Sequence, residues 1–194
     1  MKREQIKNLV LTAMFLALGL VLPFLTGQIP QIGSMLLPMH IPVFLCALVC
    51  GWKWATPMAA VLPVMRSLIF GMPPLYPTAV AMAFELATYA FVAGFIYFLL
   101  KKKDFMKRVG DSGDQAIIAA FISLISAMIF GRAVWGCAQA ILLGFGGKSF
   151  TFAAFIAGAF TNAVPGIILQ FILIPNAMFL LNEWKLVRFD GAKN

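Results

Sequence analysis

Six apolar segments, each long enough to form a helix, make up most of this 194-residue chain. Hydrophobic residues account for 62% of the sequence and charged residues for 11%, whereas a soluble domain carries about 25% charged residues. A helix that crosses a bilayer takes about 20 residues, so the chain has room for about six crossings and little else. We therefore predict an all-α integral membrane protein in which residues 1–194 form a single transmembrane domain.

The apolar segments predict six transmembrane helices. They lie at about residues 8–25, 40–51, 54–70, 78–100, 115–143 and 152–181. The second and third are short and contain prolines, so we expect both helices to be broken, which is tolerated at membrane depth only against protein or a cavity. A turn-rich stretch precedes the second helix, and the run from Gly71 to Pro77 predicts a tight connector before the fourth.

The positive charges predict the orientation in the membrane. In a six-helix arrangement nearly all lysines and arginines of the connections and ends fall on one side, and the other side carries only Lys148. Cytoplasmic loops are enriched in lysine and arginine, so both termini are predicted to be cytoplasmic. The net charge of +8 then reflects topology, and we expect no nucleic-acid partner. The residues on the charged side are Lys2, Arg3, Lys7, Lys53, Lys101, Lys102, Lys103, Lys107, Arg108, Lys185, Arg188 and Lys193.

Three charged residues, Arg66, Glu85 and Arg132, lie inside the apolar segments. A charge at the centre of a membrane helix costs about 2.5–3.5 kcal/mol, so each needs a partner, water or a ligand. With a rise of about 1.5 Å per residue, the predicted topology places all three in the outer half of the membrane, together with Asn162. We expect a polar cavity there that opens outward and binds a water-soluble molecule.

Other side chains at similar depth are expected to line this cavity. They are His40, Tyr76, Tyr89, Trp135, Gln139 and Gln170. Two arginines and one carboxylate leave one positive charge in excess, and a guanidinium suits a carboxylate or phosphate, so we expect an anionic ligand. The alternative is a purely structural ion-pair network. His40 is alternatively a capping residue, and Tyr76 a member of the interfacial aromatic belt.

Other functional classes find less support in the sequence. One histidine and three cysteines in apolar runs match no metal-ligand spacing, so we expect neither a metal nor a cofactor. The run from Gly144 to Ser149 resembles a phosphate-binding loop only at its end, because Leu142 stands where the first glycine is required. All four aspartates lie in loops or near the C-terminus, so no catalytic set is evident and we expect no enzyme. A stand-alone carrier or channel for a small anionic solute is the main alternative, although no ionisable group is evident in the inner halves of the helices.

Several stretches resemble one family of membrane proteins. The segments Leu37-Pro38-Met39-His40-Ile41-Pro42-Val43, Phe70-Gly71-Met72-Pro73-Pro74-Leu75-Tyr76-Pro77-Thr78-Ala79 and Ala83-Phe84-Glu85-Leu86-Ala87-Thr88-Tyr89 are similar to bacterial substrate-binding S components of energy-coupling factor (ECF) vitamin transporters. The six-helix size and the Ala-x-x-x-Ala pattern of the first helix point the same way. The resemblance covers nearly the whole chain.

The resemblance implies a bacterial cell-membrane location, a vitamin substrate, and partners comprising a transmembrane T component and two ATPases. The family binds its vitamin in the outer half of the membrane and then topples within the bilayer. It also implies that Ala13 and Ala17, which alone indicate only close helix packing, dock on the T component. Pantothenate, with one carboxylate, two hydroxyls and an amide, is the favoured substrate. Riboflavin, a folate, niacin and biotin stay open, whereas thiamine, a cation, fits the expected charge poorly.

Overall fold

The structure is a computed structural model that describes residues 3–25, 35–102, 111–145, 151–158 and 163–184. The described part is helical, as predicted, and contains no strand. Its elements in chain order are α1 (Arg3–Leu25), α3 (His40–Cys50), α4 (Trp52–Phe70), the π-helical turn η1 (Leu75–Ala79), α5 (Val80–Lys101), α6 (Ser112–Phe145), α7 (Phe152–Ile156) and α8 (Val164–Glu183).

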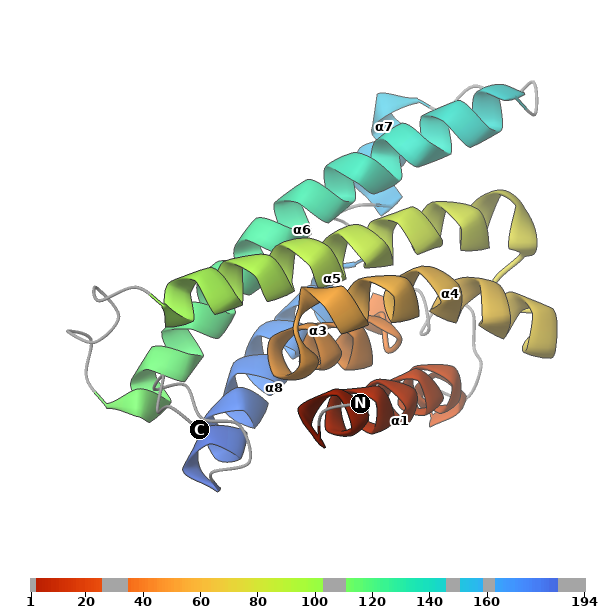
Figure 1. Cartoon of the computed structure of the whole chain (residues 1–194). Helices are drawn as coiled ribbons and strands as arrows, with labels where there is room; N and C mark the ends of the chain where they lie inside the picture. The colour runs from red at the N-terminus through yellow and green to blue at the C-terminus, as the bar shows by residue number, and fades with distance from the viewer. Residues whose placement is uncertain (1–2, 26–34, 103–110, 146–150, 159–162, 185–194) are drawn as a thin grey trace.

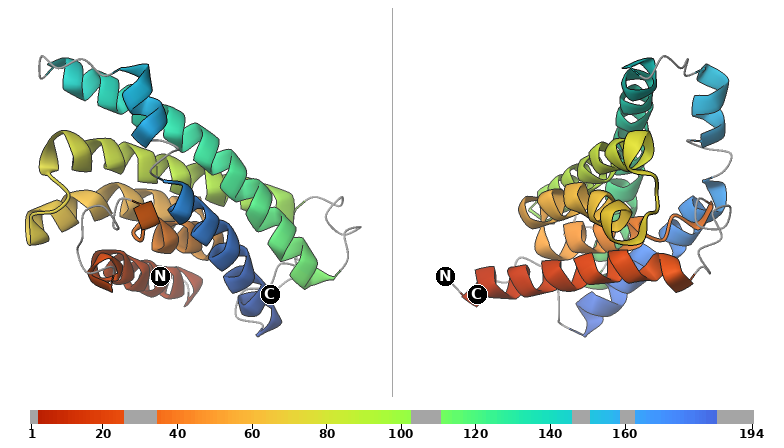
Figure 2. Two further views of the ribbon diagram at one scale, coloured as in Figure 1. Left: turned by 180° about the vertical axis from the view of Figure 1, so that it is seen from behind. Right: turned by 90° about the vertical axis from the view of Figure 1, so that its right-hand side faces the viewer.

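The short helix α3 forms the centre of the bundle. It packs against α1, α4, α5 and α8, and nearly all of its side chains are buried. A helix that is apolar on all sides is stable only when it is surrounded by protein or lipid. The long helices α5 and α6 lie side by side, and α1 lies at one edge of the molecule (Figure 1, Figure 2).

Glycines set the junction between α3 and α4. Gly51 alone connects the two helices and has φ of 87°, a conformation that residues with a Cβ rarely adopt. Gly94 of α5 faces this junction, and a Cβ at Gly94 would lie 2.7 Å from the backbone nitrogen of Trp52. The absence of a side chain at Gly94 therefore lets α5 pack directly on the corner where α3 meets α4.

Helix α4 corrects the expectation of a broken third helix. It is continuous from Trp52 to Phe70 although Pro57 and Pro63 lie within it. Each proline keeps a helical φ and removes only one backbone donor, which neighbouring helices can tolerate in a membrane protein. The helix ends at Gly71, which has φ of 71° and donates its N–H to the carbonyl oxygen of Ser67 at 2.9 Å. The second helix, α3, is short as predicted and is also unbroken.

The predicted sixth helix, residues 152–181, is wrong as a single element. The structure has a short α7 and a separate α8, with Ala163 in a turn that precedes Val164. Pro165 explains where α8 begins, because a proline is well tolerated in the first turn of a helix and poorly inside one.

Four stretches are long and apolar enough to cross a membrane: Arg3–Phe24, Leu75–Lys101, Ser112–Phe145 and Val164–Glu183. Helix α3, with 11 residues, is too short for a complete crossing. The described helices therefore support a multi-pass membrane protein, while the count of six crossings and the cytoplasmic termini stay predictions.

Candidate functional site

A buried ion pair joins the two long helices. The Arg132 guanidinium on α6 donates from Nη1 to Oε1 of Glu85 on α5 at 2.8 Å. Glu85 is 2% exposed and Arg132 is 7% exposed. A buried charge without a partner is strongly destabilising, so each of these residues requires the other as long as no ligand is bound.

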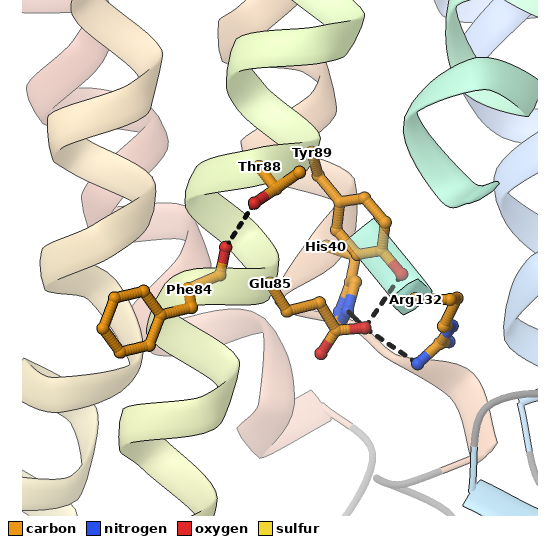
Figure 3. A network of polar contacts seen from close by, with 6 residues as sticks. All are labelled: His40, Phe84, Glu85, Thr88, Tyr89 and Arg132. Carbon is orange, nitrogen blue, oxygen red and sulfur yellow. Dashed lines mark hydrogen bonds and ion pairs between the residues drawn. The ribbon is translucent and has the colours of Figure 1, made fainter. Parts of the chain in front are cut away.

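Two further residues approach the same carboxylate oxygen. Tyr89 lies one helical turn after Glu85 and donates its hydroxyl to Oε1 at 2.8 Å. His40, the first residue of α3, places Nε2 at 3.9 Å from Oε1. The hydroxyl, the guanidinium and the imidazole thus surround one oxygen atom (Figure 3). We call His40, Glu85, Tyr89 and Arg132 the polar cluster.

Close packing fixes Tyr89 within this cluster. Its ring contacts the rings of His40 and Phe44, with centroids 5.4 Å and 5.2 Å away. On the opposite helix it lies over Gly131, where a Cβ would come within 2.2 Å of the tyrosine ring. Gly131 was not predicted as a site residue, and its position next to Arg132 in an apolar helix is the signal that the sequence offers for it.

Arg66 does not belong to the polar cluster, which corrects the expectation that three charges share one site. Its Nη1 donates to the backbone carbonyl of Leu20 in α1 at 2.6 Å. Its guanidinium lies over the rings of Phe24 and Phe70, at 5.0 Å and 5.4 Å from their centroids. Arg66 therefore connects α4 to α1, and among the described residues it forms no ion pair with Glu85.

The excess positive charge predicted for a single site is therefore divided. Glu85 and Arg132 balance one another, and Arg66 carries its charge elsewhere. An anionic ligand would then be recognised by the donors that Arg132 still has available, such as Nε.

Other predicted residues lie on the helices around the cluster. Trp135 and Gln139 follow Arg132 by three and seven positions, so they share its face of α6. Trp135 stacks on Phe155 of α7, with centroids 6.2 Å apart. Tyr76 is half exposed and donates its hydroxyl to the carbonyl of Leu142 near the end of α6. Asn162 lies outside the described residues.

Several buried polar atoms lack a hydrogen-bond partner among the described residues. They are Nδ1 and Nε2 of His40, Nε of Arg132, Oε1 of Gln139, Nε2 of Gln170 and Oγ1 of Thr56. Native interiors leave few such atoms, because each costs about 1–3 kcal/mol. Five of these six atoms belong to residues that were predicted from the sequence to line the cavity. In the described part of the chain, no three His, Cys, Asp or Glu side chains converge as a metal site would require.

A second candidate surface lies on α1. Ala13 and Ala17 are both exposed, together with the large apolar residues of the same helix. These are Ile6, Leu9, Val10, Met14, Leu18 and Val21. Only 11% of the apolar stretch of α1 is buried in the protein, the smallest share among the four candidate spans.

Comparison with known proteins gives one match. The model of a family described as "ECF transporter, substrate-specific component" matches residues 7–177. No curated protein and no solved structure matches the chain.

Proposed function

Because the chain belongs to the family of ECF transporter substrate-specific components, it is a substrate-binding subunit and not an enzyme, and we propose that it binds a carboxylate-bearing vitamin, pantothenate in the first place. Membership of the family also implies a substrate, a T component and ATPase components as partners. The identity of the vitamin, the ATP-driven assembly and the bacterial cell membrane are parts of our proposal.

The set of buried polar atoms without partners carries the proposal for the substrate. Arg132 Nε and Gln170 Nε2 are donors, Gln139 Oε1 is an acceptor, and a neutral His40 ring offers one of each. Pantothenate complements this set, because its carboxylate accepts from a guanidinium while its hydroxyls and amide both donate and accept. Helix α8, which carries Gln170, packs against both α3 and α6, so these atoms belong to adjoining helices.

Binding of radiolabelled pantothenate to the purified protein tests the substrate. We expect saturable binding, and no binding at micromolar ligand would overturn the choice of pantothenate. Riboflavin, a folate, niacin and biotin are tested as competitors, and thiamine is expected not to compete because it is a cation.

The two buried arginines provide a matched pair of variants. Arg132→Gln is expected to weaken pantothenate binding at least tenfold, because a charge-assisted hydrogen bond contributes about 1.5–3 kcal/mol. Arg66→Gln removes the same charge at the α1–α4 contact. In variant protein that elutes as a single species, the affinity for pantothenate is expected to stay within about threefold of the value for the unaltered protein. Equal loss in both variants would contradict the separation of the two arginines.

The exposed face of α1 is proposed as the docking surface for the T component. Small residues at Ala13 and Ala17 permit close approach of another helix. Ala13→Trp and Ala17→Trp should abolish uptake in cells that contain all transporter components, and binding to the isolated subunit should persist. Ala140→Trp, on an exposed position of α6, is the control and should leave uptake unchanged. Unchanged uptake in the α1 variants, or uptake into vesicles that contain this protein alone, would contradict the proposed assembly.

A further inference from the structure

We propose that an anionic ligand displaces Glu85 from Arg132, and that Glu85 then pairs with His40, which takes up one proton from solvent. This inference rests on the proposed function, since it takes Arg132 as the group that binds the ligand carboxylate. It extends that function by making binding a proton-coupled exchange of ion-pair partners.

The ligand-free cluster is electrically balanced without a charge on His40. Arg132 lies at hydrogen-bond distance from Oε1 of Glu85, at 2.8 Å. His40 lies at 3.9 Å from the same atom, and neither of its ring nitrogens has a hydrogen-bond partner among the residues that the structure describes. Arg132 therefore already balances the charge of Glu85, and His40 makes the longer contact with the same oxygen.

A ligand carboxylate changes this balance. The fork of a guanidinium recognises one carboxylate well, and Glu85 already occupies Nη1 of Arg132. Two carboxylates on one arginine would leave a net negative charge in a buried site, which is costly. The groups that face Glu85 are Arg132 from α6, His40 from α3 and Tyr89 from α5. Among them only His40 can gain a positive charge near neutral pH.

The exchange balances charge and protons. Before binding, Glu85 is paired with Arg132, His40 is neutral, and the ligand anion and one proton are in water. After binding, Arg132 is paired with the ligand carboxylate, and Glu85 is paired with protonated His40. The loaded site sums to zero only for a ligand with a single negative charge, so the exchange selects monoanions over dianions and cations.

The sequence offers an unusually direct test, because His40 is its only histidine. Protein labelled with ¹⁵N-histidine, and purified through a tag that contains no histidine, reports the ionisation state of this one ring by NMR. At about pH 8 an unpaired imidazole is neutral, and we expect the ligand-free protein to show a neutral ring.

Removing Arg132 imitates the displacement without any ligand. In Arg132→Gln at about pH 8, His40 is the one group among the described residues that can still give Glu85 a cationic partner, so we expect the imidazolium signal. The double variant Glu85→Gln/Arg132→Gln has no carboxylate and should return the ring to neutral. A neutral ring in folded Arg132→Gln would overturn the inference whatever the natural ligand is.

Pantothenate provides the second arm in the unaltered protein, which does not depend on the folding of a variant. Calorimetry in two buffers with different ionisation enthalpies should show uptake of about one proton per ligand at pH 8, with a Kd that rises up to about tenfold per pH unit by linkage. Binding with no proton uptake would overturn the inference. Absence of any binding would count against pantothenate as the substrate, and the variant spectra would still decide whether the exchange occurs.

Discussion

At the level of single residues, the polar cluster depends on a glycine as much as on its charges. Glu85 accepts from Tyr89 and Arg132 through the same oxygen, so the position of the tyrosine ring fixes the position of the ion pair. The ring has room only because Gly131 opposite it has no side chain.

We expect Gly131→Ala to disturb the cluster although it changes no polar group. The new methyl group would lie 2.2 Å from the Tyr89 ring, and overpacking of this kind costs about 1–3 kcal/mol. The midpoint of thermal unfolding in detergent and the affinity for pantothenate should both fall. Gly144→Ala, on the same helix with no atom of the described residues within 4 Å of the new Cβ, is the control and should change neither. Equal values for both variants would contradict the role of Gly131.

The sequence placed Glu85 and Arg132 at a similar predicted depth but did not show which charges would pair. The two residues meet between the neighbouring helices α5 and α6, and their depth in the membrane stays a prediction. The side of the helix on which a residue lies depends on how the helices are rotated against one another, and this rotation is a property of the packed bundle. Arg66 is therefore at the α1–α4 contact and outside the cluster.

At the level of elements, α7 and the two residues that follow it are held against α6 by two reciprocal contacts. Trp135 of α6 lies over Gly158, where a Cβ would be 2.7 Å from its ring. Phe155 of α7 lies over Gly136, where a Cβ would be 2.5 Å from its ring. The two aromatic rings also stack on each other, so a five-residue helix gains a defined position next to the face of α6 that carries Arg132.

Gly136→Val should therefore loosen α7 while leaving α6 intact. We expect hydrogen exchange in residues 152–156 to accelerate by about tenfold or more, the result of losing about 1.4 kcal/mol of local stability. Gly144→Val places the same side chain on α6 in open space and should leave that exchange rate unchanged. Unaltered exchange in Gly136→Val would show that the contact between Phe155 and Gly136 does not hold α7.

The apolar segments of the sequence predicted where helices would form, but they did not predict where a helix would be interrupted. Two prolines inside α4 do not break it, whereas the last predicted segment is divided into α7 and α8 ahead of Pro165. The difference depends on whether the surrounding helices support the backbone at that point, and a single sequence does not contain this information.

At the level of the whole molecule, the positive charges predict the orientation in the membrane. Lys102 directly follows α5, and Gly144 lies next to the last residue of α6. Both residues are exposed. The positive-inside rule places Lys102 in the cytoplasm and Gly144 outside.

Cysteine labelling in whole cells tests this orientation. In a protein whose Cys46, Cys50 and Cys137 are replaced by alanine, Gly144→Cys should react with a membrane-impermeant maleimide. Lys102→Cys should react only after the membrane is permeabilised. The opposite pattern would reverse the topology, and equal labelling of both without permeabilisation would contradict a single crossing by α6.

The unequal lengths of the helices affect how the protein sits in its bilayer. Helix α6 has 34 residues and α8 has 20, which correspond to about 51 Å and 30 Å, while the hydrocarbon layer is about 30 Å thick. A body whose hydrophobic height differs from one side to the other cannot match a flat bilayer around its whole perimeter. Such a mismatch is accommodated when the lipid thickens beside α6, when α6 tilts or when its ends extend beyond the hydrocarbon layer. Bilayer thickness, set by acyl-chain length, is therefore a variable that acts on the placement of α6 without touching the binding site.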